Sequence, residues 1–428
     1  MKKLSYLLLS SLLITFSCTG DNTQMVSLGI DDMYYLPRMK TYLLQPAFTG
    51  DEYRWTMHHN GIDSVVSTKS KYYFLAKDTG TYNMTFEIID PVSPYKHEFC
   101  FKVVQEEVEY SPYISKVYDY NPAPGQFVNN MPEYLEGDTR EDMIKKVEEN
   151  ISGTNDVMVS LGAYGGYVVF GFDHTVINVK NKYDFSIYGN SFYSDLEEYK
   201  KMKGGSCEPG IVMVSFDTNQ NGLPDDEWYE LAGSEYYKPE TLKNYTITYS
   251  RSNPNREPVA DMSQGIVDLE YIPWTDNYGN EGYVSRNMYH TQDYYPSWIK
   301  DNQMTFNGTR LRNNGKDESG YGMYYVLYSF EWGYVDNHPN QFTDLISFDI
   351  DWAVDAKGNR VSLPGVDFIK VYTGVNQQCG KIGETSTEIV RARDLHINVD
   401  NDKLPNVEDL NNQYKKVLKK FHLNDTTD

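Results

Sequence analysis

The sequence predicts a mainly β protein with a small N-terminal domain and a larger C-terminal one. Short apolar runs bounded by Gly, Asn or Asp, residues that tolerate turn geometries, occur at residues 167–172, 185–188 and 211–216. Residues 346–354 alternate apolar and polar side chains with a period of two, the pattern of a half-buried strand. A chain of 428 residues is long enough for two domains, one of them large.

The N-terminus has the features of an export signal, because the basic start Met1-Lys2-Lys3 precedes an apolar core over residues 4–16. This core is shorter than the about 20 residues that a membrane-spanning helix needs. It ends at Ser17-Cys18, and a small residue before a cysteine resembles a bacterial lipoprotein processing site. We therefore expect a signal peptide over residues 1–17, lipidation at Cys18 and a polar tether over residues 18–30. Two acyl chains would anchor the protein stably in a membrane.

Residues 31–108 are predicted to form a small β-domain. Trp55 lies in an alternating run, and the turn Asp78-x-Gly80-x-Tyr82 leads into a further strand. A tryptophan strand followed by Asp-x-Gly-x-Tyr resembles PKD-type immunoglobulin-like modules. The resemblance implies a sandwich in which the tyrosine packs across from the tryptophan. Because PKD-type modules usually act as spacers, we favour a spacer over a ligand site here.

Residues 111–400 are predicted to form a jelly-roll-like β-sandwich with long loops, which would carry the ligand site. The pair Asp138-x-x-Glu141 resembles a cap at the start of a short helix. Residues 267–298 contain eight aromatic side chains among Gly, Asn, Asp and Pro without a regular period, so we expect a long loop there. Residues 401–428 are predicted to form a helix and tail packed on the large domain.

The formal net charge of −22 argues against nucleic acid as a partner, because nucleic-acid binding rewards dense Lys and Arg patches. Beyond Cys18 the chain has three cysteines, an odd number at wide spacing, which is not a disulfide framework. Cys207 and Cys379 could pair if their strands are neighbours, or they could be buried free thiols. The sequence has no CxxC or HExxH motif to support a zinc site.

The loop after residues 211–216 has the composition of a calcium site. Asp217, Asn219 and Asn221 alternate, Gly222 allows a tight bend, and Asp225 follows. The twelfth position, which holds a bidentate Glu in an EF-hand, is Trp228, so the loop is closer to those of dockerin-like and thrombospondin-like repeats. We predict that Asp217, Asn219, Asn221 and Asp225 bind Ca²⁺ to fix the loop. The alternative is an Asx-rich turn without metal.

We expect a binding protein and not an enzyme. Carboxylate pairs such as Asp349 and Asp351 could be imagined as acid and base, but alternating acids on a strand are more often a solvated face. The histidines lie in separate segments without ligand spacing, and a Ser-His-Asp arrangement cannot be recognised from scattered residues.

Aromatic residues are crowded into residues 267–298 and 332–334. Exposed aromatic rings among Asn, Asp and Gln suit a ligand with a large flat surface and many amides or hydroxyls. The alternative is that about half or more of these rings pack the loops down as a satellite core. The predicted ligand-binding residues are Trp274, Tyr278, Tyr283, Tyr289, Tyr294, Tyr295, Trp298, Trp332 and Tyr334.

A series of motifs spans residues 112–396 in order: PAPGQFVN, LGAYGGYVVFGFDH, DFSIYGNSF, EPGIVMVSFDTNQNGLPDDEWYELAGSEY, GYVDNHPN, FDIDWAVD, GVDFIKVYTGV and GETSTEIVRARDLH. The series resembles a family of Bacteroidetes cell-surface lipoproteins that carry a PKD-type module before this domain, and the BtuH-type cobalamin-binding proteins are similar to it. The resemblance implies a lipid-anchored protein exposed on the outer membrane, which captures cobalamin (vitamin B12) or a related corrinoid for a TonB-dependent transporter. Cobalamin would be a ligand and not a cofactor. The alternatives are a glycan-binding lipoprotein and a structural adhesin.

Overall fold

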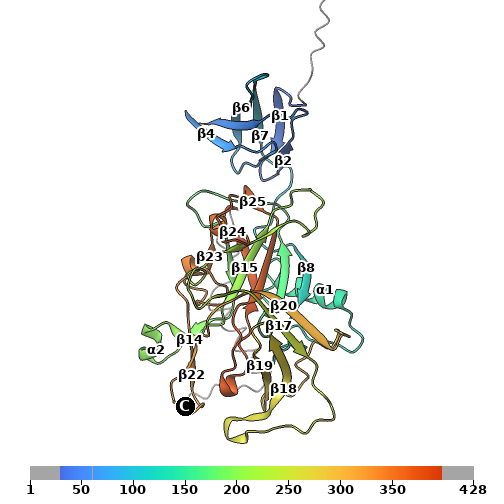
Figure 1. Ribbon diagram of the computed structural model, residues 1–428, viewed down its shortest axis with the longest axis vertical. Helices are drawn as coiled ribbons and strands as arrows, with labels where there is room; N and C mark the ends of the chain where they lie inside the picture. Colours follow the sequence, from blue (N-terminus) through green and yellow to red (C-terminus); the bar gives the residue numbers. More distant parts are fainter. Residues whose placement is uncertain (1–28, 60, 398–428) are drawn as a thin grey trace, which may run out of the picture. The chain divides into compact units, whose positions relative to one another are not determined.

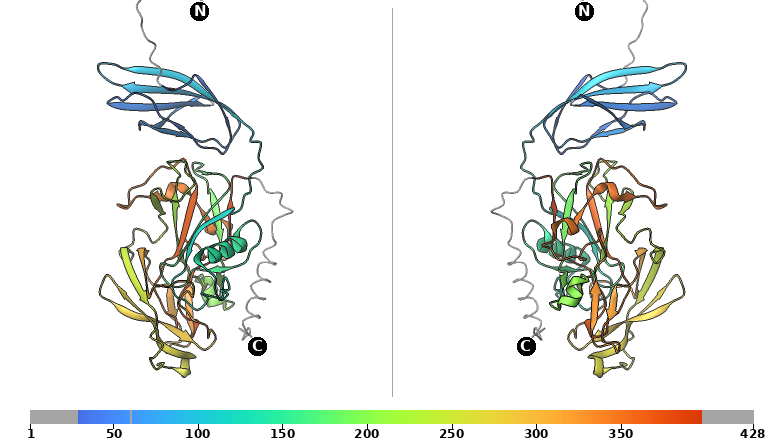
Figure 2. Two further views of the ribbon diagram at one scale, coloured as in Figure 1. Left: turned by 90° about the vertical axis from the view of Figure 1, so that its right-hand side faces the viewer. Right: turned by 90° about the vertical axis from the view of Figure 1, so that its left-hand side faces the viewer.

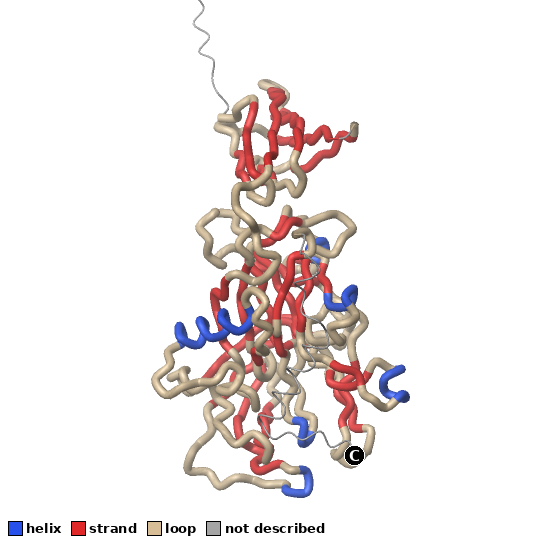
Figure 3. Tube along the Cα trace, turned by 180° about the vertical axis from the view of Figure 1, so that it is seen from behind, coloured by secondary structure: helices blue, strands red, loops and turns tan. Residues whose placement is uncertain are grey.

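The structure is a computed structural model that describes residues 29–59 and 61–397. Strands and connecting loops dominate it and helices are few (Figure 3), which confirms the predicted mainly β fold. Among the described residues, no helix combines the length and apolarity needed to cross a lipid bilayer. The signal peptide, Cys18, most of the tether and the C-terminal helix lie outside the described residues.

The described chain forms two compact units. The smaller unit contains residues 29–34, 43–59, 61–72 and 82–100, and the larger contains residues 101–397 together with segments 35–42 and 73–81. The N-terminal strands form a five-stranded sheet, β1-β7-β6-β3-β4, and a two-stranded sheet, β2-β5. Their bounds are β1 (Met33–Pro37), β2 (Tyr42–Leu44), β3 (Glu52–His59), β4 (Ile62–Ser67), β5 (Tyr72–Phe74), β6 (Gly80–Ile89) and β7 (Tyr95–Val104).

Trp55 is at the centre of the smaller unit. Its side chain is fully buried, its ring contacts those of Tyr72, Phe86 and Phe99, and its indole N–H donates to the carbonyl of Lys69 at 2.9 Å. Trp55 is therefore the core of this unit, with its one polar group satisfied as burial requires.

The larger unit is organised around a six-stranded sheet in the order β24-β16-β15-β26-β10-β8. Figure 1 labels its strands β24, β15 and β8. Apolar cores cover both faces of this sheet, so its inner strands β10 and β15 are nearly continuous apolar runs that do not alternate. This explains why the predicted runs 167–172 and 211–216 correspond to β10 and β15. The strand bounds are β8 (Lys116–Asn121), β10 (Tyr167–Gly171), β15 (Gly210–Ser215), β16 (Trp228–Leu231), β24 (Ala353–Val354) and β26 (Phe368–Thr373).

One face of the central sheet packs against a three-stranded sheet and a helix. Val212 and Val214 of β15 share a core with Phe185 and Ile187 of β12. The sheet has the order β23-β12-β28, with β12 (Phe185–Tyr188), β23 (Ser347–Phe348) and β28 (Arg391–Asp394). Helix α1 (Arg140–Ile151) lies alongside the strands of the larger unit (Figure 2) and buries Met143, Val147 and Ile151 in this core.

The start of α1 differs from the predicted cap. Thr139 is the N-cap and forms a capping box with Asp142: the Thr139 hydroxyl accepts from the Asp142 N–H at 3.2 Å, and the Asp142 carboxylate accepts from the Thr139 N–H at 2.9 Å. The expected pair of Asp138 and Glu141 was wrong by one residue. Asp138 instead accepts from the Leu135 N–H at 2.7 Å and forms an ion pair with Lys146.

The other face of the central sheet packs against a four-stranded sheet in the order β19-β18-β17-β20. Ile211 of β15 and Tyr372 of β26 share this second core with Tyr245, Ile247 and Tyr249 of β17. The strand bounds are β17 (Leu242–Ser250), β18 (Ile266–Asp276), β19 (Glu281–Asn287) and β20 (Gln303–Arg310).

Smaller elements complete the larger unit. A four-stranded sheet has the order β13-β14-β22-β21, and two-stranded sheets pair β11 with β25 and β27 with β9. The bounds are β9 (Val159–Ser160), β11 (Val176–Ile177), β13 (Phe192–Tyr193), α2 (Glu197–Lys201), β14 (Gly204–Ser206), β21 (Gly315–Asp317), β22 (Tyr325–Tyr328), β25 (Gly365–Val366), β27 (Glu388–Ile389), and the 3-10 turns η1 (Met262–Gln264), η2 (Thr343–Ile346), η3 (Ile350–Trp352) and η4 (Gly380–Ile382). Cys207 and Cys379 are buried free thiols in the described structure.

The prediction of one strand over residues 346–354 was wrong. The segment passes from one sheet to another: β23 pairs with β12, the turn η3 intervenes, and β24 pairs with β16. Side chains hold the turn, since Asp349 accepts from the Asp351 N–H at 2.8 Å and Asp184 accepts from the Ile350 N–H at 2.9 Å. The period of two in this segment therefore does not mark one continuous strand.

The expectation of a long loop over residues 267–298 was wrong for residues 267–287, because β18 and β19 form a hairpin there, whereas residues 288–298 contain no strand or helix. The register of this hairpin shifts between Ile266 and Asp268, and again between Asp268 and Ile272. Each such irregularity changes which face the following side chains occupy, so the alternation that identifies a strand is lost from the sequence.

Candidate functional site

Four of the nine predicted ligand-binding residues are buried. Tyr294, Tyr295 and Tyr334 belong to the core under the β19-β18-β17-β20 sheet, and Trp298 stacks on Tyr120 in the other core. The buried tyrosine hydroxyls have partners: those of Tyr294 and Tyr334 accept backbone N–H groups at 3.2 and 3.0 Å, and that of Tyr295 donates to a carbonyl at 2.9 Å. These four side chains match the alternative of a satellite core, since burial leaves them no surface for a ligand.

The other five predicted residues are separated by the fold. Trp332 lies on the loop after β22 and packs against Trp352, with ring centroids 4.8 Å apart. Trp274, Tyr278, Tyr283 and Tyr289 all lie in the β18–β19 hairpin or directly after it. The nine residues therefore do not form one face.

Within the hairpin, strand geometry decides which aromatic side chain is available. Trp274 of β18 lies directly opposite the buried Tyr249 of β17. Its side chain is therefore on the inner face of the sheet, where it is half-buried. Gly282 lies opposite Trp274, and a Cβ there would come within 2.5 Å of the indole ring. Tyr283 is the next residue and points to the opposite, exposed face. Tyr278, in the hairpin turn, stacks on Tyr245 and remains exposed.

The outer face of this sheet is polar and open. Register places Thr305 of β20 opposite Thr248 of β17, Thr248 opposite Thr275 of β18, and Thr275 opposite Glu281 of β19. One row of hydroxyl and carboxylate groups thus crosses all four strands. The Thr248 and Thr305 hydroxyls hydrogen-bond each other at 2.9 Å, which fixes both side chains. Tyr283 stands beside this row, two residues from Glu281 on the same face of β19.

Two further cross-strand pairs extend the outer face. The Asn307 amide donates to the Thr246 hydroxyl at 2.8 Å, and the Gln303 amide donates to the Ser250 hydroxyl at 3.2 Å. Ser250 and Gln303 also line an open hollow of about 920 Å³ at the end of the two strands. Its other lining residues are Arg251, Ser252, Pro254, Asp301 and Asn302. The face, defined as Thr246, Thr248, Ser250, Thr275, Glu281, Tyr283, Gln303, Thr305 and Asn307, is hereafter called the polar sheet face.

The sequence alone indicates part of the polar sheet face. Residues 244–249 alternate as a half-buried strand, which places Thr246 and Thr248 on the side away from the core. The pairing of that strand with β20 and β18 is what makes a surface of these side chains, and strand order cannot be inferred from one strand's pattern.

The predicted calcium loop brings its four side chains together. The Asp217 carboxylate accepts from the Asn221 and Gly222 N–H groups at 3.1 and 2.8 Å, and the Asn219 and Asn221 amides donate to Asp225 at 3.0–3.2 Å. Gly222 has a φ of +72°, the left-handed conformation that glycine adopts without strain. These contacts suit both an ion-binding loop and an Asx-rich turn.

The histidines considered for catalysis have separate structural partners. His174 lies between Asp173 and Asp394, and His396 contacts Asp184 at 2.8 Å. Burial lowers the pKa of both His290 and His338 to about 4, so these two rings are neutral at physiological pH.

No protein-family model matches the chain. No curated protein matches it either. Similar solved structures include the SusE-like protein BT2857, with 8% identity and a TM-score of 0.22, covering 80% of this chain and 88% of the other. Another comes from a study titled "Structural basis for the promiscuous specificity of the carbohydrate-binding modules from the beta-sandwich super family", with 10% identity and a TM-score of 0.14, covering 82% and 90%. Superpositions this loose carry no argument about function.

Proposed function

We propose that the larger unit is a ligand-binding module of a cell-surface lipoprotein, that it acts without catalysis, and that it binds a glycan on the polar sheet face. The observation that carries this proposal is the row of Thr305, Thr248, Thr275 and Glu281 beside the exposed ring of Tyr283. Sugars present hydroxyl groups at their edges and C–H groups on their faces. Hydroxyl, amide and carboxylate side chains form hydrogen bonds with the sugar hydroxyls, and an aromatic ring packs on the C–H face of the sugar.

The rigidity of the face supports this proposal. Neighbouring strands are about 4.8 Å apart, so the row offers hydrogen-bonding groups at a spacing comparable to one sugar ring. Cross-strand hydrogen bonds already hold Thr248, Thr305, Thr246 and Asn307 in place. A pre-organised face loses little side-chain entropy when a ligand binds, which leaves more of the contact energy as affinity.

The second candidate ligand is cobalamin or a related corrinoid. The ordered motifs over residues 112–396 favour it, because they resemble those of Bacteroidetes surface lipoproteins. A corrinoid ring is fringed by amides, which Asn307 and Gln303 could bond, and Tyr283 could pack on its plane. In this case the protein would act beside a TonB-dependent transporter at the outer membrane.

The proposal is tested by binding measurements on the mature protein with two kinds of probe. One arm screens soluble polysaccharides by affinity gel electrophoresis, and the other titrates cyanocobalamin by calorimetry. Tyr283→Ala should weaken binding of the active probe by about 2 kcal/mol or more, roughly 30-fold, with little change in melting temperature. Tyr237→Ala is the matched control, because Tyr237 is an exposed tyrosine on another part of the larger unit.

The two arms also choose between the ligands. Retardation by a polysaccharide that Tyr283→Ala abolishes supports the glycan, and a calorimetric signal with cyanocobalamin alone supports the corrinoid. Binding that survives Tyr283→Ala and Thr248→Val unchanged would place the ligand elsewhere and overturn the assignment to the polar sheet face.

A further inference from the structure

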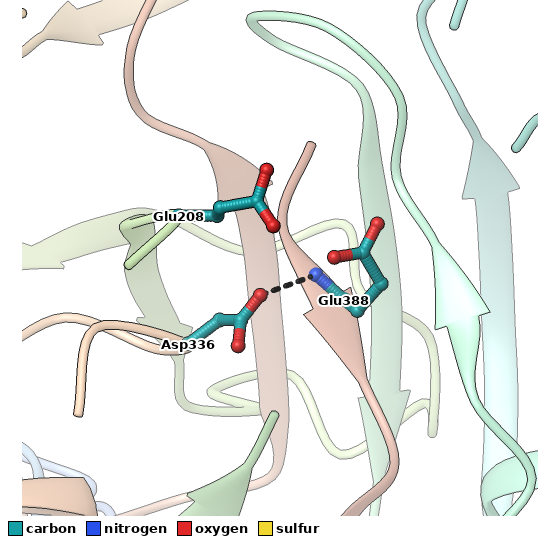
Figure 4. A group of neighbouring side chains, drawn as sticks. All are labelled: Glu208, Asp336 and Glu388. Atoms are coloured by element: carbon teal, nitrogen blue, oxygen red, sulfur yellow. Dashed lines mark hydrogen bonds between the residues drawn. The ribbon is translucent and has the colours of Figure 1, made fainter. Parts of the chain in front are cut away.

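Three carboxylates meet inside the larger unit, away from the polar sheet face. Oxygen atoms of Glu208, Asp336 and Glu388 all lie within 4.8 Å of one another (Figure 4). Asp336 and Glu388 are each 1% exposed, and Glu208 is partly buried. They come from three distant segments: the residues before β15, the loop between β22 and β23, and β27.

Backbone hydrogen bonds fix the positions of these three segments. The Glu208 N–H donates to the Asp336 carbonyl at 2.8 Å, and Gly210 and Val335 exchange two backbone hydrogen bonds at 2.9 and 3.0 Å. The Glu388 N–H donates to the Asp336 carboxylate at 3.0 Å. The carboxylates therefore converge because the main chain holds them, and flexible side chains alone could not produce this arrangement.

Among the described residues, no Lys, Arg or His forms an ion pair with any of the three carboxylates. Arg391, on the strand that follows β27, pairs with Asp156 at 3.0 Å instead. Burying a carboxylate without a counter-charge costs several kcal/mol. Burial raises the pKa of each of the three groups above its ordinary value, and repulsion from neighbouring carboxylates raises those of Glu208 and Glu388 further.

Hydrogen bonds satisfy only part of the cluster. Asp336 accepts backbone N–H groups from Asn190 and Ser191, both at 2.7 Å, and Glu208 accepts one from Ser386 at 3.2 Å. Both carboxylate oxygens of Glu388 are buried and neither accepts a well-formed hydrogen bond, although the hydroxyls of Ser386 and Ser160 lie close enough to lower its pKa. A buried acceptor of this kind is rare in folded proteins and calls for an unseen partner.

We propose that Glu208, Asp336 and Glu388 bind one divalent cation of the calcium class in the interior of the larger unit. The donor set is made of carboxylate oxygens, which hard cations prefer. Ca²⁺ binds oxygen at about 2.3–2.6 Å, so two ligands on opposite sides of one ion are about 4.6–5.2 Å apart. The separations in the cluster fit that limit. The two carboxylate oxygens of Glu388, which accept no well-formed hydrogen bond, would be ligands of the ion.

Such an ion would link the residues before β15, the loop carrying Asp336 and β27. Its binding energy would contribute to the stability of the folded chain, because the three ligands come together only after folding. The site is separate from the loop of Asp217–Asp225, which shares none of these residues, and from the polar sheet face. The carboxylate cluster can therefore be tested whether or not a glycan or corrinoid binds to the polar sheet face.

The experiment measures bound calcium and melting temperature for the wild type, Glu388→Gln and, as the control, Glu240→Gln. Gln keeps the volume of Glu388 and removes its charge, whereas Glu240→Gln makes the same change at an exposed residue outside both the cluster and the loop of Asp217–Asp225. We expect Glu388→Gln to bind one equivalent less calcium than the wild type and to lose the corresponding calcium-dependent rise in melting temperature. In chelator, Glu388→Gln should melt at the same temperature as the wild type or above it, because one uncompensated buried carboxylate is gone.

A second variant and one contrary result complete the test. If Glu388→Gln fails to fold, Glu208→Gln at the more accessible member of the cluster replaces it, with the same loss of one equivalent expected. Equal calcium content and equal calcium response in the wild type and both cluster variants overturn the site, and the three groups are then protonated neighbours without an ion.

Discussion

His174 is the residue whose environment gives the plainest consequence for pH. Its fully buried ring contacts Asp173 through Nδ1 and Asp394 through Nε2, both at 2.7 Å. Burial lowers the pKa of His174, but the hydrogen bonds to the two carboxylates raise it by more, so that it reaches about 9. The imidazolium form is therefore the native form at neutral pH.

We predict that this residue makes the protein less stable in alkali. The pKa of a histidine in the unfolded chain is about 6.5. The stability gained from charged His174 is fully present below that pH and is lost as the pH rises through about 9. Melting curves from pH 6 to pH 10 should show this decline, and His174→Gln should be less stable at pH 6 and show a shallower decline. Parallel curves for the two proteins would contradict the assignment.

Single tyrosines could not be assigned to core or surface from the sequence. Tyr294 and Tyr283 are eleven residues apart in the same aromatic-rich segment, yet one is fully buried and the other is exposed. A tyrosine can be buried when its hydroxyl finds a partner, here the Asn287 N–H for Tyr294. That partner is set by the end of β19 and the loop after it, which composition does not show.

At the scale of elements, one substitution in the loop of residues 217–225 can distinguish the stability that comes from calcium binding from the stability that comes from the turn itself. Asp217 accepts two backbone N–H groups, so Asp217→Ala should cost about 1–3 kcal/mol of stability even in chelator. If the loop also binds Ca²⁺, the difference from the wild type should grow with calcium, by about 2.7 kcal/mol when the ion is at 100 times its dissociation constant. Unfolding by denaturant in both conditions measures the two terms. The same difference with and without calcium would mean that the loop is a turn alone.

Strands were predictable where burial on both sides made them uniformly apolar, and less so where the chain changes partner. The runs that became β10, β12 and β15 are mostly apolar and mostly buried. The segment 346–354 has a cleaner period, but Asp349 and Asp184 bond its backbone into a turn at η3. Asp184 is more than 160 residues away in the chain, so local pattern could not reveal that contact.

At the scale of the whole molecule, each of the two proposed sites forms only when folding brings distant segments of the chain together. The polar sheet face needs four strands in the order β19-β18-β17-β20, and the carboxylate cluster joins Glu208, Asp336 and Glu388. Each of these three acids lies in a motif that the sequence singled out, EPG, GYVDNHPN and GETSTEIV, but no spacing rule connects them. Only the fold shows that they are neighbours.

The position of the molecule in the cell rests on Cys18, and it stays a prediction because residues 1–28 lie outside the described structure. The basic and apolar start followed by Ser17-Cys18 predicts cleavage before the cysteine and attachment of lipid to its thiol. Cys18→Ala should remove both, so that the protein leaves the outer-membrane fraction or keeps its signal peptide. Cys100→Ala is the matched control and should fractionate like the wild type, because Cys100 lies on β7 inside the folded chain. Fractionation followed by mass measurement distinguishes the outcomes, and digestion of intact cells with an added protease reports exposure at the surface. If Cys18→Ala has the mature mass and membrane association of the wild type, the lipid anchor is excluded, while the polar sheet face and the carboxylate cluster keep their own separate tests.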